Sequence, residues 1–82
     1  MEPYLGEIRL FPFNFAPKGW AACNGASYPI AQYQALFALI GTTFGGDGRT
    51  NFALPNLASK SPFPEGVIGY CIATQGVFPA RD

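Results

Sequence analysis

The glycine-rich stretch at residues 41–57, GTTFGGDGRTNFALPNL, constrains the fold of this chain most strongly. It follows an apolar, helix-like run and ends in an extended Leu-Pro segment. Within it, glycines surround one acid and a base follows soon after, so the backbone can adopt positive φ at little steric cost. We interpret the stretch as a scaffolding loop, braced by a contact between the acid and the base, and expect it to be the hinge between two halves of a small domain. The residues assigned to this structural loop are Gly41, Gly45, Gly46, Asp47, Gly48 and Arg49.

Ligand-binding interpretations of this loop fail on single residues. Gly41 and Gly46 have the spacing of a phosphate-binding P-loop, but Asp47 stands where the lysine is required and would repel a phosphate. A dinucleotide-binding pattern fails because Asn51 replaces the third glycine. The similarity to a calcium-binding repeat is faint, since the motif occurs once and Thr50 replaces a liganding aspartate. We therefore expect no metal and no cofactor at the loop.

Composition indicates that the chain does not work as a free monomer. Its 82 residues make one domain at most, and the core of such a domain alone would leave it marginally stable. Hydrophobic residues make up 49% of the sequence and charged residues only 12%, against about 25% charged residues in ordinary soluble domains. Residues 19–46 carry no charge, and the net charge is zero. Because such a monomer would be poorly soluble, we expect much of its apolar surface to face another subunit.

Several partners and activities are not expected. No basic stripe is present to neutralise nucleic-acid phosphates, and proline and glycine interrupt every apolar run before the roughly 20 residues of a membrane span. The chain has no histidine for a Ser-His or Cys-His nucleophile, and its acidic residues are scattered, so we expect no enzyme. The N-terminal residues lack the basic and apolar regions of a signal peptide. We therefore expect synthesis in the cytosol, with any export by lysis or a dedicated route.

The two cysteines, Cys23 and Cys71, lie far apart in the sequence and do not form a C-x-x-C pair. Without histidine, the usual Cys/His zinc sites are nearly excluded. Two alternatives stay open: a pair of buried thiols, or one disulfide that would contribute about 3–4 kcal/mol by restricting the unfolded chain. The redox compartment decides between them, and the sequence does not state the compartment.

Alternating polarity predicts two main strands. In residues 4–13, Glu7 and Arg9 alternate with Ile8 and Leu10, which is typical of an edge or half-buried strand. In residues 67–77 both alternating sets are apolar, which predicts the strongest strand of the chain. Shorter extended segments are expected at residues 21–23, 28–30 and 51–55.

Residues 31–40 predict a helix of about three turns. Apolar side chains recur at helical spacing and Gly41 supplies the C-cap, although no good N-cap residue starts the helix. Because no lysine or glutamate marks a solvated face, we expect the helix to be covered on more than one side. Upstream of it, the Asn24-Gly25 dipeptide predicts a tight type I′ turn.

Aromatic side chains support one alternative function. Trp20, Tyr28, Tyr33 and Tyr70 could form a platform on which a sugar stacks. We favour burial in the core or in a subunit interface, where aromatic residues dominate the energetics. For Asn24 we favour a role in the turn over a polar contact with a ligand. The candidate ligand contacts are Trp20, Asn24 and Tyr28.

Three sequence motifs follow one another along the chain: YLGEIRLF at residues 4–11, PKGWAACNG at 17–25 and QALFALIGTTFGGDGRTNFALPNL at 34–57. Their order closely resembles the phage tail collar domain, most nearly the bacterial branch called microcystin-dependent proteins. Residues 72–81 also resemble the end of those chains. The resemblance implies a small mixed domain of tail-fibre proteins that packs in trimers and serves assembly, with no catalytic residue in the family motif. Leu57 is followed by Ala-Ser-Lys rather than the usual Arg-Gly-Arg, and the longer segment that many members carry before the final strand is missing, which favours a minimal building block.

Together these observations predict an α+β fold, with short antiparallel strands, one central helix and the glycine-rich loop in a single domain over residues 1–82. We expect a structural protein that self-assembles into a homo-oligomer, as a trimer or an extracellular filament, with a terminal strand either lent to a neighbour or paired within its own sheet. The expected location is extracellular or in a virion or tail-like particle. The alternative is an adhesion module that binds a receptor or a cell-surface glycan. The residues expected at the assembly interface are Ile8, Leu10, Phe11, Phe13, Ile68, Tyr70, Ile72, Val77 and Phe78.

Overall fold

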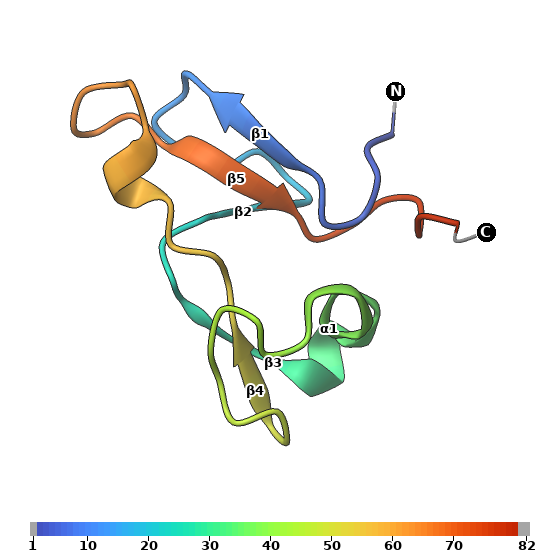
Figure 1. The fold of residues 1–82 in the computed structure, drawn as a ribbon. Helices are drawn as coiled ribbons and strands as arrows, with labels where there is room; N and C mark the ends of the chain where they lie inside the picture. The colour runs from blue at the N-terminus through green and yellow to red at the C-terminus, as the bar shows by residue number, and fades with distance from the viewer. Residues whose placement is uncertain (1, 81–82) are drawn as a thin grey trace.

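The computed structural model describes residues 2–80, so that Met1, Arg81 and Asp82 of the expected domain lie outside the described residues. The helices and strands are, in chain order, β1 (Ile8–Phe11), β2 (Trp20–Ala22), β3 (Ser27–Pro29), the 3-10 helix η1 (Ile30–Gln32), α1 (Gln34–Ile40), β4 (Asn51–Ala53), the 3-10 helix η2 (Ala58–Lys60) and β5 (Gly69–Ala73). Figure 1 shows two groups, with β1, β5 and β2 at one end and β3, β4 and α1 at the other. The predicted α+β fold with antiparallel strands is confirmed.

β5 is the centre of an antiparallel three-stranded sheet with the strand order β1-β5-β2. Its register places Ile72 opposite Ile8 of β1 and Ala21 of β2. A strand that is covered on both faces needs apolar residues at successive positions, whereas an edge strand tolerates alternation. The burial agrees, because Cys71, Ile72 and Ala73 of β5 are all buried and most of β1 is exposed. Both strand predictions are therefore confirmed.

The second group consists of a two-stranded sheet and the helix. β3 and β4 pair antiparallel, with Tyr28 opposite Phe52. The helix packs against this sheet through Phe37, whose ring centroid lies 5.6 Å from that of Phe52. The segments around residues 28–30 and 51–55 were both expected to be extended, and these two strands confirm it.

The hydrophobic core lies between the two groups and connects them. Its side chains come from the N-terminal segment and the three-stranded sheet on one side, and from α1 and the β4 region on the other. The bulkiest members, Phe52, Leu36 and Leu54, are at most 1% exposed. The buried residues of this cluster are Leu5, Ala21, Cys23, Leu36, Phe52, Leu54 and Ile72.

The central helix starts later than predicted. α1 begins at Gln34, and residues 30–32 form the 3-10 helix instead. Tyr33, with φ −134° and ψ 44°, separates the two, and no side chain caps either N-terminus. The sequence offers no Ser, Thr, Asp or Asn here, so the first α-helical N–H groups have no side-chain acceptor to hold them.

The C-terminal end of the helix agrees with its prediction, but its covering does not. Gly41 ends α1 with φ 54°, and its N–H donates to the Phe37 carbonyl at 2.7 Å. Leu36 is the one residue of α1 that is buried, so the cover expected on more than one side is not provided within the described chain. No helix within residues 2–80 has both the length and the apolar character needed to cross a membrane.

The type I′ turn predicted at Asn24-Gly25 is wrong. Throughout residues 2–80 only glycines have positive φ, so Asn24 does not adopt the conformation that this turn requires. The Asn24 side-chain oxygen instead accepts a hydrogen bond from the Ala26 N–H at 3.0 Å, as in an Asx turn. The flanking strands do not pair with each other, because β2 pairs with β5 and β3 pairs with β4.

The expected hinge is also misplaced. The glycine-rich loop joins α1 to β4, which belong to the same group (Figure 1). The two groups are joined by residues 23–26 and 54–57, which lie antiparallel to each other. The Leu57 N–H donates to the Cys23 carbonyl at 2.8 Å, and the Leu54 N–H donates to the Ala26 carbonyl at 3.0 Å. A hydrogen-bonded pair of segments therefore makes this connection.

The N- and C-terminal segments pair with each other. Tyr4 and Val77 form a parallel bridge, in which Leu5 N–H donates to Val77 O and Val77 N–H donates to Pro3 O, both at 2.9 Å. Gly76 allows this approach, because a Cβ there would collide with the Pro3 carbonyl and lie 3.1 Å from the Leu5 nitrogen. In this structure the two terminal segments therefore pair with each other within one chain.

Candidate assembly surface

Asp47 is the organising side chain of the glycine-rich loop. Its Oδ1 accepts hydrogen bonds from the N–H groups of Arg49, Thr50 and Asn51 at 2.8, 2.9 and 3.2 Å. Its Oδ2 accepts one from the Thr50 hydroxyl at 3.1 Å, and the Asp47 N–H donates to Asn51 Oδ1 at 3.0 Å. These donors, the Arg49 N–H foremost, stabilise the charged carboxylate and lower the pKa of Asp47 from 3.8 to about 2.

The hydrogen-bonding capacity of Asp47 is taken up by the loop itself. The predicted contact with Arg49 exists, but it comes from the Arg49 backbone N–H, and the described ion pairs do not include the Arg49 guanidinium. Among residues 2–80, no group of His, Cys, Asp or Glu side chains is arranged to hold a metal ion. The hydrogen bonds of the Asp47 carboxylate fix the conformation of the loop.

Gly46 brings the loop close to β4. Its φ is 96°, and an added Cβ would collide with the Phe52 Cα and lie 2.9 Å from the Asn51 carbonyl oxygen. The Gly48 N–H donates to the same Asn51 carbonyl at 3.1 Å. The loop is therefore fixed directly on the strand that carries Phe52 into the core.

Cys23 and Cys71 are buried free thiols in this structure. The register places Cys71 opposite Ala22, and the Cys23 N–H donates to the Tyr70 carbonyl at 3.0 Å. Since opposed residues share a face and successive residues alternate, Cys23 lies on the core side of the sheet and Cys71 on the other side. Burial raises the pKa of Cys23 to about 11 and also raises the pKa of Cys71. The geometry favours two thiols over a disulfide within the chain.

Most residues expected at the assembly interface lie at the surface. Those that are 37–53% exposed are Ile8, Leu10, Phe13, Val77 and Phe78. Those that are half-buried are Phe11, Ile68 and Tyr70. Ile72 is a correction, because it is 1% exposed, belongs to the core and is not available to another subunit. Alternation in an all-apolar strand does not tell which of its two faces is the inner one.

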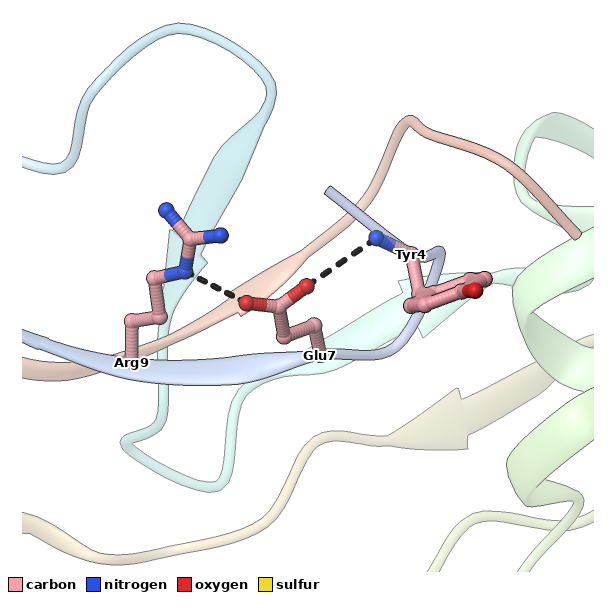
Figure 2. Close-up of polar contacts among 3 residues, drawn as sticks. All are labelled: Tyr4, Glu7 and Arg9. Atoms are coloured by element: carbon pink, nitrogen blue, oxygen red, sulfur yellow. Dashed lines mark hydrogen bonds and ion pairs between the residues drawn. The ribbon is translucent and has the colours of Figure 1, made fainter. Parts of the chain in front are cut away.

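β1 and the preceding residue, Glu7, present an ion pair on one face and apolar side chains on the other. Glu7 accepts hydrogen bonds from Arg9 Nε and, at 3.0 Å, from the Tyr4 N–H, as Figure 2 shows. The hydrogen bond from Arg9, followed by that from Tyr4, lowers the pKa of Glu7. Ile8 and Leu10 alternate with this pair, as their spacing in the sequence predicts.

A row of aromatic rings lies beside Arg9. Phe11 stacks on Phe13 and Phe13 on Phe15, each with ring centroids 5.6 Å apart. Trp20 meets Phe11 edge to face at 4.9 Å, and the Arg9 guanidinium lies 5.5 Å from the centre of its ring. Phe15 is 60% exposed and was missed in the sequence. Its two-residue spacing from the preceding phenylalanines was the signal that could have found it.

The three candidate ligand contacts do not form one site. Trp20 is half-buried and already contacts Phe11 and Arg9. Tyr28 comes from the other sheet, where its ring centroid lies 4.9 Å from that of Tyr33 and its side chain packs against the core. Burial raises the pKa of Tyr28. The Asn24 amide oxygen is engaged in its own turn. No sugar-stacking platform is assembled from these residues.

A surface hollow of about 320 Å³ lies beside η2 and the start of β5. Its polar side chains are those of Ser61 and Glu65. The Ser61 hydroxyl oxygen already accepts the Phe63 N–H at 3.2 Å. The hollow therefore lacks the convergent polar groups by which pockets fix a small ligand.

The fold and these surfaces define a small structural domain, with a glycine-rich loop held by its own hydrogen bonds, buried thiols and several exposed large hydrophobic side chains. A family model, Phage Tail Collar Domain, matches residues 6–62, which is more than half of the chain. The chain belongs to the phage tail collar family, and the resemblance of the sequence motifs to the collar domain is confirmed. It is thereby placed among the structural components of phage tails. No individual curated protein matches it.

Proposed function

We propose that this chain is a structural subunit of a phage tail or tail-like particle and that it assembles with copies of itself. The observation that carries the proposal is the apolar surface that the fold leaves uncovered. Each of the large hydrophobic side chains concerned is at least 37% exposed. They are Tyr4, Ile8, Leu10, Phe13, Phe15, Phe44, Val77 and Phe78.

The physical reason is the balance between this surface and the charge of the chain. Scattered exposed hydrophobic residues are normal on any protein, but here they accompany zero net charge and only 12% charged residues. Burying apolar surface contributes about 25 cal/mol per Å² removed from water. Contact between copies would remove such surface and stabilise a domain too small to bury much of its own. Membership of the collar family supports the proposal, since a tail component acts within an assembly.

The proposed assembly is a homo-oligomer, either a trimer, as the resemblance to the collar domain implies, or an extracellular filament. One route is exchange of a terminal strand. Residues 3–5 and 77 pair through backbone hydrogen bonds close to the chain ends. The same bonds would form between two chains if one terminal segment docked on its neighbour, as in domain swapping.

Sedimentation equilibrium at micromolar concentration tests self-assembly directly. We expect a homo-oligomer that persists when salt is raised, because apolar contacts are screened little by ions. Replacing Phe13 and Phe15 by serine should weaken the association. Both side chains are exposed, so their replacement should leave the core of the domain intact. A stable monomer of the wild-type chain at these concentrations would contradict the proposal.

Adhesion to a receptor or to a cell-surface glycan is the alternative function, and the geometry supports it less. The rings of Trp20 and Tyr28 contact other aromatic rings of the chain and lie in different sheets. A glycan array separates the two functions: binding that is lost on Trp20→Ala but kept on Phe44→Ala would favour adhesion. An array without hits would leave assembly as the function.

A further inference from the structure

The two edges of the three-stranded sheet differ in their free hydrogen-bonding groups. On β2, the outward-facing residues are Trp20 and Ala22, because the Cys23 N–H bonds inward to Tyr70. The Trp20 N–H donates to the Pro17 carbonyl at 3.0 Å, and the Ala22 carbonyl accepts the Asn24 N–H at 3.0 Å. The Trp20 N–H and the Ala22 C=O are therefore already hydrogen bonded within the same chain and are not available to another strand.

The β1 edge is open. The Ala73 N–H donates to the Glu7 carbonyl at 2.8 Å, so alternate residues from Glu7 onwards bond inward to β5. The N–H and C=O groups of Ile8 and Leu10 therefore point away from β5, and no turn or loop backbone hydrogen bond within residues 2–80 uses them. Their side chains are 42% and 37% exposed. Free backbone groups beside exposed apolar side chains are a template for another strand.

The open stretch is short and has defined ends. Pro12, at the next outward position, has no N–H to offer. On the other side, the Gly6 N–H turns inward and donates to the Ala73 carbonyl at 2.9 Å. The edge therefore suits only a short partner strand.

We propose that β1 pairs antiparallel with β1 of a second copy, about a two-fold axis at Ile8. This inference rests on the proposed self-assembly and names one contact within it. Charge complementarity selects the partner and the register, because Glu7 of each copy then lies opposite Arg9 of the other. In this register Ile8 exchanges two backbone hydrogen bonds with Ile8 of the other copy, whereas Leu10 lies opposite Gly6, whose N–H is already bonded to Ala73. A register centred on Arg9 would oppose two guanidinium groups, and one centred on Leu10 would place Pro12 opposite Ile8. Since β2 is partly closed, pairing of β1 with β2 of another copy is disfavoured, and the contact is a closed two-fold. Such a contact belongs to the filament form of the proposed assembly and not to a trimer with three-fold symmetry alone.

Disulfide cross-linking tests the register. In this arrangement residue 8 lies opposite itself, with Cα atoms about 5.5 Å apart, which is within the range of a disulfide. Ile8→Cys should form a covalent dimer on mild oxidation, and Phe44→Cys, a side chain of similar exposure on the glycine-rich loop, should not. Cross-linking of Arg9→Cys that equals or exceeds that of Ile8→Cys overturns the register.

Charge reversal tests the contact in solution without new thiols. Glu7→Lys and Arg9→Glu should each raise the dissociation constant by about tenfold, because each places like charges opposite each other twice. An equimolar mixture of the two variants should associate as tightly as the wild type. If the wild type is an oligomer that neither reversal weakens, this contact is refuted and self-assembly stands. If the wild type is a monomer, the proposed function itself fails.

Discussion

Asp47 and Asn51 hydrogen bond to each other twice. The Asp47 N–H donates to Asn51 Oδ1 at 3.0 Å, and the Asn51 N–H donates to Asp47 Oδ1 at 3.2 Å. This exchange joins the middle of the glycine-rich loop to the first residue of β4, so that the loop and the strand hold each other in place. The stability of the loop therefore depends on the charge of one carboxylate.

The first prediction is that Asp47 makes the folded state sensitive to acid. Its pKa is about 2 in the folded state and 3.8 when unperturbed, so the unfolded chain binds a proton first. The stabilisation is complete above pH 3.8 and is lost as the pH falls to about 2. Asp47→Asn should lower the stability at neutral pH and flatten its dependence on pH within this window. Urea unfolding at a series of pH values measures both effects.

Glu65→Gln is the matched control for this prediction. Glu65 is exposed, and within residues 2–80 its carboxylate accepts no hydrogen bond. Its replacement should leave the curve of stability against pH almost unchanged. Some dependence on pH should remain in both variants, because the pKa of Glu7 is also lowered. An Asp47→Asn curve parallel to that of the wild type between pH 4 and pH 2 would show that the loop hydrogen bonds do not act on stability.

The second prediction separates a steric clash from backbone strain. Gly46 and Gly66 have φ of 96° and 93°, but an added Cβ collides with β4 at Gly46 and meets nothing within 4 Å at Gly66. Gly66→Ala should cost about 1–2 kcal/mol from the backbone conformation alone. Gly46→Ala should cost about 1–3 kcal/mol more from overpacking. Equal shifts of the urea midpoint in the two variants would mean that the loop can move away from β4.

The features of this fold that depend on neighbouring residues in the sequence could be predicted from sequence patterns. The alternation in β1 and the double apolar pattern in β5 are properties of consecutive residues, so they predicted an edge strand and a central strand. The glycine-rich loop was interpreted as scaffolding for a similar reason, since Asp47 finds all its partners within the next four residues. The ordered motifs also identified the family.

Features set by distant parts of the chain could not be predicted in this way. Asn24-Gly25 has the composition of a hairpin turn, but its flanking strands find their partners elsewhere along the chain. Ile72 was placed at an interface because the pattern does not tell which face of β5 meets α1 and β4. The open edge of β1 follows from the strand order β1-β5-β2, which pairs β1 with a strand about 60 residues later in the sequence.

The third prediction concerns the cysteines. Because Cys23 and Cys71 are buried on opposite faces of the sheet and both have raised pKa values, their thiols should react slowly with Ellman's reagent in the folded protein. Both should react at once in denaturant, and a reductant should leave the melting temperature unchanged. Phe44→Cys provides a third, exposed thiol that should react quickly in the folded state. Failure to find both native thiols in denaturant would indicate a disulfide instead.

The last prediction tests the core that connects the two groups of elements. Phe52 is 0% exposed and packs against Phe37, so Phe52→Ala should cost about 3–5 kcal/mol. This is a large share of the stability of a domain of this size, and the variant should be mostly unfolded near physiological temperature. Phe44→Ala removes an equal volume from a side chain that is 47% exposed and should change the stability by less than about 0.5 kcal/mol. Both are measured by thermal unfolding at one protein concentration, since self-association would shift the midpoint. Similar losses in the two variants would mean that Phe44, one of the exposed hydrophobic side chains on which the self-assembly proposal rests, is buried in the assembled protein.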